Sequence, residues 1–179
     1  MKVGRHLSGL VDHKFALGQI QQDTLPMDVG EVSPNSLISD CNALVDNQAK
    51  SMGLTLDLSG FEGDALPTVK ADPTRLKQVV LNILSNAVKY NATGKEISLG
   101  SEIENAGFLH IEIMDDGPGI LLDKQEDLFT PFNRLGMEAK EIEGTGIGLS
   151  ISKVLMGAMG GDIGHRNVES GGACFWVSI

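Results

Sequence analysis

The segment Asn82-Ile83-Leu84-Ser85-Asn86-Ala87-Val88-Lys89 carries two opposite signals within one predicted helix. The pair Asp72-Pro73 predicts the start of this helix, because aspartate is a good N-cap and proline is tolerated in the first turn. Apolar side chains then recur at helical spacing and predict a buried face. The residues of this face are Leu76, Val79, Val80, Ile83, Leu84 and Ala87. A second face carries polar side chains, which are Gln78, Asn82, Asn86 and Lys89.

The polar face is not explained by helix propensity, because asparagine is a mediocre helix former. Aligned amide oxygens suit Mg²⁺, which prefers oxygen ligands and usually shares its coordination shell with phosphates and water. Lys89, one turn after Asn86, would neutralise such phosphates. For this segment alone, a solvent-exposed helix face is an equally good interpretation.

A second polar segment, Asp115-Asp116-Gly117-Pro118-Gly119-Ile120, follows a predicted strand. In that strand Leu109, Ile111, Ile113 and Asp115 alternate with other residues and share one face. A carboxylate that emerges from a covered apolar face needs a hydrogen-bond donor, and the exocyclic amine of adenine is such a donor. The glycines would let the backbone approach a flat ring. In isolation, an ordinary turn is the alternative interpretation.

A third segment, Gly144-Thr145-Gly146-Ile147-Gly148-Leu149, opens a helix predicted over residues 145–159. Alternate glycines before a helix N-terminus expose several N–H groups and are typical of a phosphate cradle. A dinucleotide-binding fingerprint follows a strand with different glycine spacing, and a P-loop requires Gly-Lys-Ser/Thr, so both are excluded. By itself this glycine pattern is weak evidence.

The rest of the chain predicts short strands and further helices with hairpin-length turns. Several strand pairs are connected too closely for a crossover helix, which disfavours a doubly wound parallel sheet. The sequence therefore predicts an α+β two-layer sandwich. Further helices are expected over residues 3–22 and 34–52, and strands over 27–32, 54–58, 66–71, 96–103, 108–115, 162–167 and 173–179. Expected buried residues include Leu44 and Met52 in the helix 34–52, and Ile147, Ile151, Val154, Leu155 and Ala158 in the helix 145–159.

Composition excludes several functional classes. The 179 residues include 24 acidic and 14 basic side chains, so the net charge of −10 argues against a nucleic-acid-binding protein. Cys41 and Cys174 lie far apart without metal-ligand spacing, which argues against a disulfide framework or a zinc site. No apolar run approaches the roughly 20 residues that a membrane-spanning helix needs.

Together and in this order, the patterns Asn-x-x-x-Asn-x-x-Lys, Asp-x-Gly-x-Gly and Gly-x-Gly-x-Gly-Leu resemble the N, G1 and G2 boxes of the ATP-binding domain of sensor histidine kinases. That domain belongs to the GHKL superfamily, which includes gyrase, heat-shock chaperone and mismatch-repair ATPases. Residues 128–135, Leu-Phe-Thr-Pro-Phe-Asn-Arg-Leu, resemble the F box of histidine kinases. The resemblance covers residues 25–179, with an ATP lid at about 121–143, and implies the Bergerat fold, in which about three helices cover one face of a mixed, mostly antiparallel sheet. Residues 1–24 resemble, more loosely, the end of the second dimerisation helix.

The resemblance implies roles for individual residues around ATP or ADP and Mg²⁺. Asn86 would be the principal Mg²⁺ ligand with Asn82 in support, and Lys89 would contact the phosphates. Asp115 would accept a hydrogen bond from the adenine amine, and Tyr90 would line the adenine pocket. The pocket wall and the phosphate-facing hinge of the lid would comprise Gly117, Gly119, Ile120, Gly144, Thr145, Gly146, Gly148 and Leu149. The mobile lid would contain Phe129, Phe132 and Arg134, and catalysis would rest on Asn82, Lys89 and Arg134.

One position bears on the reaction. Hydrolytic members of the superfamily place a glutamate four residues before the metal-binding asparagine, where it activates water. Here that position is Asn82, which cannot act as a base, so ATP would be held for transfer by positioning and charge neutralisation. The resemblance thus implies a protein-histidine kinase, which passes the γ-phosphoryl group to a histidine of a dimerisation domain and then to a response-regulator receiver domain.

The four histidines, His6, His13, His110 and His165, all lack the sequence context of the phosphoacceptor. This chain alone is therefore not expected to autophosphorylate, and the dimerisation domain of a homodimeric, cytoplasmic or membrane-anchored parent would supply the acceptor. The domain itself is expected in the cytoplasm. Two alternatives stay open, which are a nucleotide-binding pseudokinase that acts as a scaffold and an ATPase or serine kinase of the same fold.

Overall fold

The computed structural model describes residues 26–63, 66–91, 94–103, 108–133 and 145–179. The helix predicted over residues 3–22 lies outside these residues, as do Arg134 and Gly144 of the predicted site.

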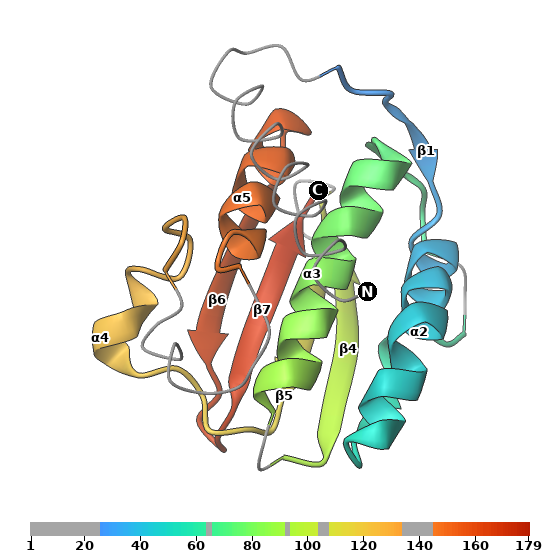
Figure 1. Ribbon diagram of the computed structural model, residues 1–179. Helices are drawn as coiled ribbons and strands as arrows, with labels where there is room; N and C mark the ends of the chain where they lie inside the picture. Colours follow the sequence, from blue (N-terminus) through green and yellow to red (C-terminus); the bar gives the residue numbers. More distant parts are fainter. Residues whose placement is uncertain (1–25, 64–65, 92–93, 104–107, 134–144) are drawn as a thin grey trace, which may run out of the picture.

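A five-stranded sheet forms one layer of the molecule (Figure 1). The strands of the described residues are β1 (Gly30–Val32), β2 (Thr55–Asp57), β3 (Val69–Ala71), β4 (Glu96–Ile103), β5 (Leu109–Asp115), β6 (Asp162–Asn167) and β7 (Ala173–Ser178). The sheet has the order β2-β4-β5-β7-β6, in which β2 and β4 are parallel and the other pairs are antiparallel. β1 and β3 form a separate antiparallel pair.

Helices form the second layer and cover one face of this sheet (Figure 1). They are α2 (Pro34–Ser51), α3 (Pro73–Tyr90) and α5 (Gly148–Ala158). α3 lies between the other two and contacts both of them as well as β5. The predicted α+β sandwich with a mixed, mostly antiparallel sheet is therefore confirmed.

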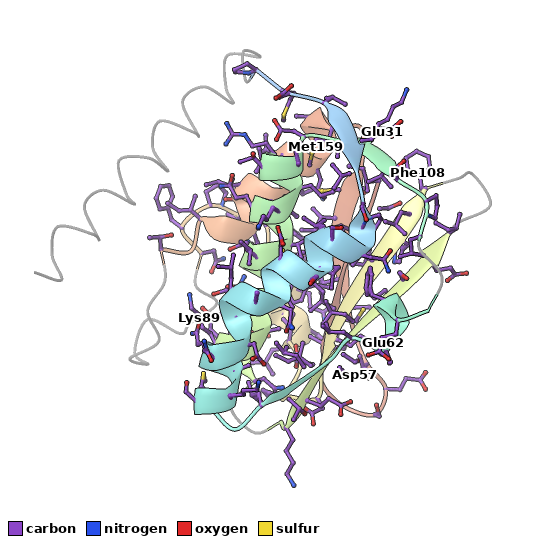
Figure 2. The ribbon with its side chains drawn as sticks, turned by 90° about the vertical axis from the view of Figure 1, so that its right-hand side faces the viewer. Glu31, Asp57, Glu62, Lys89, Phe108 and Met159 are labelled. Carbon is purple, nitrogen blue, oxygen red and sulfur yellow. The ribbon has the colours of Figure 1, made fainter. Side chains whose placement is uncertain are left out.

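The core lies between the helices and the sheet, where Figure 2 shows a dense layer of side chains. Every second residue of β5 points into it, so that Leu109, Ile111 and Ile113 are at most 1% exposed. On α3 the predicted apolar face is buried, and Val88 belongs to it as well. Because the apolar face of α3 is covered, its polar residues lie on the other sides of the helix. Lys89 is one of them and is labelled in Figure 2.

The prediction for α5 was wrong at its start and on one of its faces. The helix begins at Gly148 instead of Thr145, because Gly146 has a left-handed φ of 70° that a right-handed helix cannot contain. Val154 and Ala158 are exposed, whereas Ser150 and Ser152 occupy the buried face. Leu44 of α2 and Met52, which follows the last residue of α2, were likewise expected to be buried and are 61% and 46% exposed.

Two short elements had no signal in the sequence pattern. They are the 3₁₀ turn η1 (Ser59–Phe61) and the one-turn helix α4 (Leu122–Gln125) within the predicted lid. β1, β2 and β3 are shorter than the strands predicted there, while β4 and β6 have the predicted bounds.

We expect the Asp72→Ala substitution to lower the free energy of unfolding by about 1–2 kcal/mol, as loss of a strong N-cap does. Asp72 is 5% exposed, and its Oδ1 accepts hydrogen bonds from the N–H groups of Thr74 and Arg75 at 2.9 and 3.0 Å. Its Oδ2 accepts a third from the N–H of Asp28 at 3.0 Å. Urea denaturation at pH 7 measures the change.

Ser33→Ala is the matched control, because Ser33 caps α2 through a single exposed contact with the N–H of Ser36 at 3.4 Å. It should cost clearly less stability than Asp72→Ala. Equal losses would contradict the idea that the buried, three-bonded cap dominates. Although burial opposes ionisation of Asp72, these backbone hydrogen bonds lower its pKa below 3.8, so its contribution should fade only as the pH falls below that value.

Candidate functional site

The N-box face of α3 presents polar side chains beside its buried stripe. Asn82, Asn86, Lys89 and Tyr90 are all partly exposed, and they follow one another along the C-terminal half of the helix. Their placement follows from burial of the apolar face, because the helical period then leaves these positions on one flank. The predicted alignment of Asn82 and Asn86 is thus present in the structure.

Asp115 ends β5 on the covered side of the sheet, as its alternation with Ile111 and Ile113 predicts. Its Oδ1 accepts hydrogen bonds from the N–H groups of Gly117 at 3.0 Å and Ala173 at 3.3 Å. Within the part of the chain that the structure describes, its Oδ2 accepts none. Burial raises the pKa of this carboxyl above 3.8, although the two backbone hydrogen bonds oppose the shift. The site therefore holds a partly desolvated carboxylate with one oxygen available to a ligand.

Asp116, the next residue, has the opposite environment and a structural role. It accepts hydrogen bonds from the Asn91 side chain at 3.0 Å and from the N–H groups of Lys95 and Glu96. The hydrogen bond from Asn91 makes the largest contribution to lowering the pKa of Asp116 to about 2. Asn91 also donates to the Glu96 carbonyl at 3.0 Å. This cluster joins the end of α3 to the start of β4 and to the turn that carries Asp115.

The far side of the same turn is held by Asn167 at the end of β6. Its Oδ1 accepts a hydrogen bond from the N–H of Ile120 at 3.0 Å, and its Nδ2 donates to the Ile120 carbonyl at 2.8 Å. Gly119 has a φ of 70°, and a Cβ there would lie 3.0 Å from the Gly172 carbonyl oxygen. The G1 turn is therefore fixed at both ends, as a wall against which a flat ring can pack.

The F-box segment is attached to α5 and β6 by its first phenylalanine. The Phe129 ring lies 6.2 Å from the His165 ring, and Lys153 Nζ lies 5.0 Å from the Phe129 centroid. Leu128 is 6% exposed and belongs to the core. This part of the predicted lid is thus packed onto the body of the domain.

Phe132 differs from Phe129 in both exposure and backbone conformation. Its side chain is 60% exposed, and its φ of 64° is unusual for a residue other than glycine. Its N–H donates to the Gly146 carbonyl at 2.9 Å, which joins the F box to the G2 box. Thr145, Gly146, Gly148 and Leu149 lie partly exposed at the start of α5.

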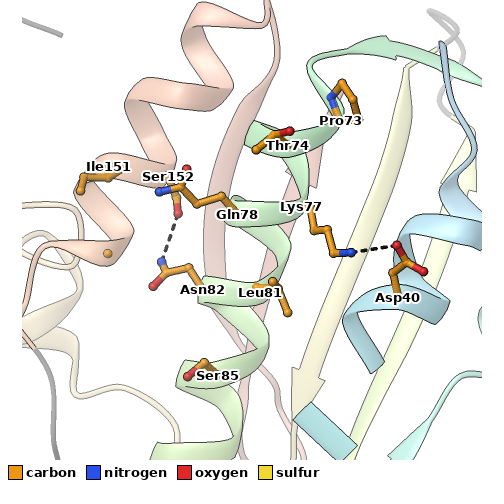
Figure 3. A pocket seen from close by; sticks show the side chains of 11 residues that line it. Asp40, Pro73, Thr74, Lys77, Gln78, Leu81, Asn82, Ser85, Ile151 and Ser152 are labelled. Carbon is orange, nitrogen blue, oxygen red and sulfur yellow. Dashed lines mark hydrogen bonds and ion pairs between the residues drawn. The ribbon is translucent and has the colours of Figure 1, made fainter. Parts of the chain in front are cut away.

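The helix that begins in the G2 box, α5, also contacts the N box directly. The Asn82 side chain donates from Nδ2 to Ser152 Oγ at 3.1 Å across the α3–α5 interface (Figure 3). A cavity of about 730 Å³ opens beside this contact, between the polar flank of α3, the start of α5 and α2. Of the predicted site residues, Asn82 and Gly148 line it, whereas Asp115, Asn86 and Lys89 do not.

The donor set fits Mg²⁺ better than a transition metal. Among the described residues, no three His, Cys, Asp or Glu side chains lie close enough to hold an ion. The polar flank of α3 instead offers neutral amide oxygens, which suit an ion that takes its remaining ligands from phosphates and water. A bound Mg²⁺ would neutralise charge on such phosphates.

Residues 71–179, more than half of the chain, match the family of histidine kinase-, DNA gyrase B- and HSP90-like ATPases. The chain belongs to this family. The resemblance drawn from the N, G1 and G2 boxes is thereby confirmed. In the described part of this ATPase domain, no helix has the length and apolar character needed to cross a membrane.

Relatives of this ATPase domain include a sensory/regulatory protein and a histidine kinase. The sensory/regulatory protein RpfC of Xanthomonas campestris pv. campestris is 30% identical over an alignment of 181 positions, which covers 98% of this chain and 25% of RpfC. Full-length ShkA, solved in complex with AMPPNP, has a TM-score of 0.83 and 28% identity over 99% of this chain and 36% of its own. Histidine kinase ThkA, solved in complex with the response regulator TrrA, has a TM-score of 0.71 and 25% identity over 97% of this chain and 48% of its own. The chain thus spans about a quarter of the length of RpfC.

Sequence reasoning missed the residues that hold the ATPase-domain motifs in place. No role was predicted from the sequence for Asn91, Asn167 or Ser152. Asn91 lies 25 residues from Asp116 and Asn167 lies 47 from Ile120, so no local pattern connects them. Ser152 alone offered a signal, since it interrupts the apolar positions of α5.

We expect Asp115→Asn to weaken ADP binding about tenfold or more, because a charge-assisted hydrogen bond contributes about 1.5–3 kcal/mol. The variant should unfold at the same temperature as the parent or higher at pH 7. The folded-state pKa of Asp115 lies above 3.8, so burial penalises the ionised carboxylate at neutral pH, and the neutral amide avoids that penalty. Calorimetric titration with ADP and thermal denaturation measure the two effects.

Glu112→Gln is the control for this experiment, because Glu112 lies on the opposite face of β5 and pairs with Arg166 at 3.0 Å. It should leave ADP affinity unchanged. Parental ADP affinity in the Asp115→Asn variant would refute the role of this carboxylate in binding adenine.

Proposed function

We propose that this chain is the ATP-binding catalytic domain of a sensor histidine kinase, which transfers the γ-phosphoryl group of ATP to a histidine on a dimerisation domain. The observation that carries this proposal is the carboxylate of Asp115, held through Oδ1 by two backbone N–H groups while Oδ2 is available beside a glycine turn. Such a group is matched to an amine donor, and adenine presents one on the edge of a flat ring.

In this proposal the nucleotide lies between the G1 turn and the polar flank of α3. Asn86 holds Mg²⁺, Lys89 contacts the phosphates and Tyr90 lines the adenine pocket. Asn82 supports the metal through its amide oxygen, and Arg134 belongs to the lid as a phosphate contact. The remaining contacts come from the backbone of the G1 and G2 boxes and from the lid, and they comprise Gly117, Gly119, Ile120, Phe129, Phe132, Gly144, Thr145, Gly146, Gly148 and Leu149.

Transfer is favoured over hydrolysis by the chemistry of Asn82. An amide cannot take a proton from water at neutral pH, and its nitrogen already donates to Ser152. The chain therefore lacks a general base at the position from which the hydrolytic relatives activate water. Its residues instead bind, orient and neutralise the phosphates, which is how phosphoryl transfer is mostly accelerated.

The partners follow from what the relatives bind. ShkA was solved with an ATP analogue and ThkA with a response regulator. By analogy, the phosphoryl group would pass from the acceptor histidine to a receiver-domain aspartate. We further propose that residues 1–24 end a dimerisation helix, that residues 25–179 form the catalytic domain, and that the full protein is a homodimer with this domain in the cytoplasm, where ATP is available.

We expect the chain to bind ADP more tightly with Mg²⁺ than with EDTA, and Asn86→Ala to remove most of that difference. The alanine lacks the oxygen that completes the metal shell, so binding in Mg²⁺ should weaken by about tenfold while binding in EDTA changes little. Asn47→Ala, an exposed asparagine on α2, is the control and should behave as the parent. Absence of ADP or ATP binding by calorimetry would refute the proposed function.

We also expect slow ATP turnover by the chain alone and phosphohistidine formation once a dimerisation domain is supplied in trans. The measurement uses radiolabelled ATP with an acceptor domain from a related kinase and with its His→Ala variant as the control. Nucleotide binding without phosphohistidine would favour a pseudokinase scaffold. Fast steady-state hydrolysis would favour an ATPase of the same fold.

A further inference from the structure

A notch on α5 receives the side chain of Asn82. Gly148 and Ser152, one helical turn apart, form its two sides and face α3. A Cβ on Gly148 would collide with Asn82 Oδ1, while Ser152 Oγ accepts the hydrogen bond from Asn82 Nδ2 at 3.1 Å (Figure 3). The N-box amide is therefore enclosed by the G2 helix on two sides.

The burial of Ser152 calls for an explanation. The residue is 2% exposed and lies among Ile151, Leu155 and Met156, where an alanine would pack without a polar group to satisfy. A buried hydroxyl without a partner costs free energy. The bond from Asn82 gives this hydroxyl a partner on another helix. By contrast, Ser150, 6% exposed on the same helix, donates to the Ile147 carbonyl of its own first turn at 2.8 Å.

The hydrogen bond between Asn82 and Ser152 determines whether the oxygen or the nitrogen of the Asn82 amide faces the start of α5. An asparagine side chain has one nitrogen that donates and one oxygen that accepts. With the nitrogen bonded to Ser152, the oxygen lies against Gly148, where the exposed N–H groups of a helix N-terminus favour an oxygen over a nitrogen. Without Ser152, the amide could turn its nitrogen to this side.

We propose that Ser152 is a positioning residue for nucleotide binding, which holds the Asn82 amide with its nitrogen at Ser152 and its oxygen beside Gly148 at the start of α5. This inference rests on the proposed function, in which the Asn82 oxygen supports the Mg²⁺ nucleotide complex. In this proposal Ser152 acts through Asn82 and without a contact of its own to nucleotide or metal. It acts by fixing an amide that would otherwise present a donor, which repels a cation, for part of the time.

The test compares Ser152→Ala with Ser150→Ala, which removes a second buried hydroxyl from the same helix without touching α3. Calorimetry gives the Kd of ADP in Mg²⁺ and in EDTA. The Kd in EDTA divided by the Kd in Mg²⁺ measures how much the metal contributes to binding. Ser152→Ala should lower this ratio about threefold to tenfold, the range expected for losing one hydrogen bond. Ser150→Ala should leave the ratio unchanged, and Ser152→Thr, which keeps the hydroxyl, should restore it.

A double-mutant cycle shows whether Ser152 acts through Asn82. In an Asn82→Ala background, Ser152→Ala should produce no further change in the ratio. Thermal denaturation of every variant reports any loss of stability separately. An equal fall of the ratio in Ser150→Ala and Ser152→Ala, or additive effects in the cycle, would overturn the positioning role.

The outcomes also separate this inference from the proposed function. If the parent chain binds ADP without any benefit from Mg²⁺, or binds no nucleotide, both proposals fail. If the parent shows the Mg²⁺ benefit and Ser152→Ala retains all of it, only the role of Ser152 fails.

Discussion

Burial of the apolar face of α3 is the constraint on which the rest of the domain depends. This face is covered by β5, α2 and α5 together, and Leu76, Val79, Val80 and Ile83 have no measurable exposure. Once that face is fixed, the helical period determines where Asn82, the first asparagine of the N box, must lie. The site is thus a by-product of core packing, because the same helix that closes the core carries the polar flank.

The two neighbouring aspartates of the G1 box have different environments, one suited to stabilising the fold and the other to binding a ligand. Asp116 is surrounded by donors, and its pKa falls to about 2. Among the described residues Asp115 has two backbone donors, and burial raises its pKa. A carboxylate that is fully satisfied stabilises the fold, whereas one that is desolvated and half-satisfied costs stability until a ligand completes it. The order of the pair follows from strand alternation, since Asp115 shares the covered face with Ile113 and Asp116 does not.

The sequence was sufficient to predict an element where the pattern that specifies it is local. β4 was predicted with its observed bounds, and so was the cap of α3 at Asp72, because alternation and capping are read within a few residues. It was insufficient where tertiary contacts override the pattern. Ser152 is buried because Asn82 lies opposite it, 70 residues earlier. Val154, two residues after Ser152, lies on the opposite side of the helix and is exposed.

The glycines of the G2 box show that residues of one sequence motif can have different structural roles. Their alternation suggested one shared purpose, a phosphate cradle, but Gly146 and Gly148 meet different steric demands. Gly146 takes a left-handed φ and accepts the N–H of Phe132, a residue that is itself left-handed at a cost on the order of 1–3 kcal/mol. At Gly148 a Cβ would displace the Asn82 amide from its observed position. The start of α5 is therefore the place where the F box and the N box are both attached. A change at either glycine would disturb a different neighbour, even though both belong to a single motif in the sequence.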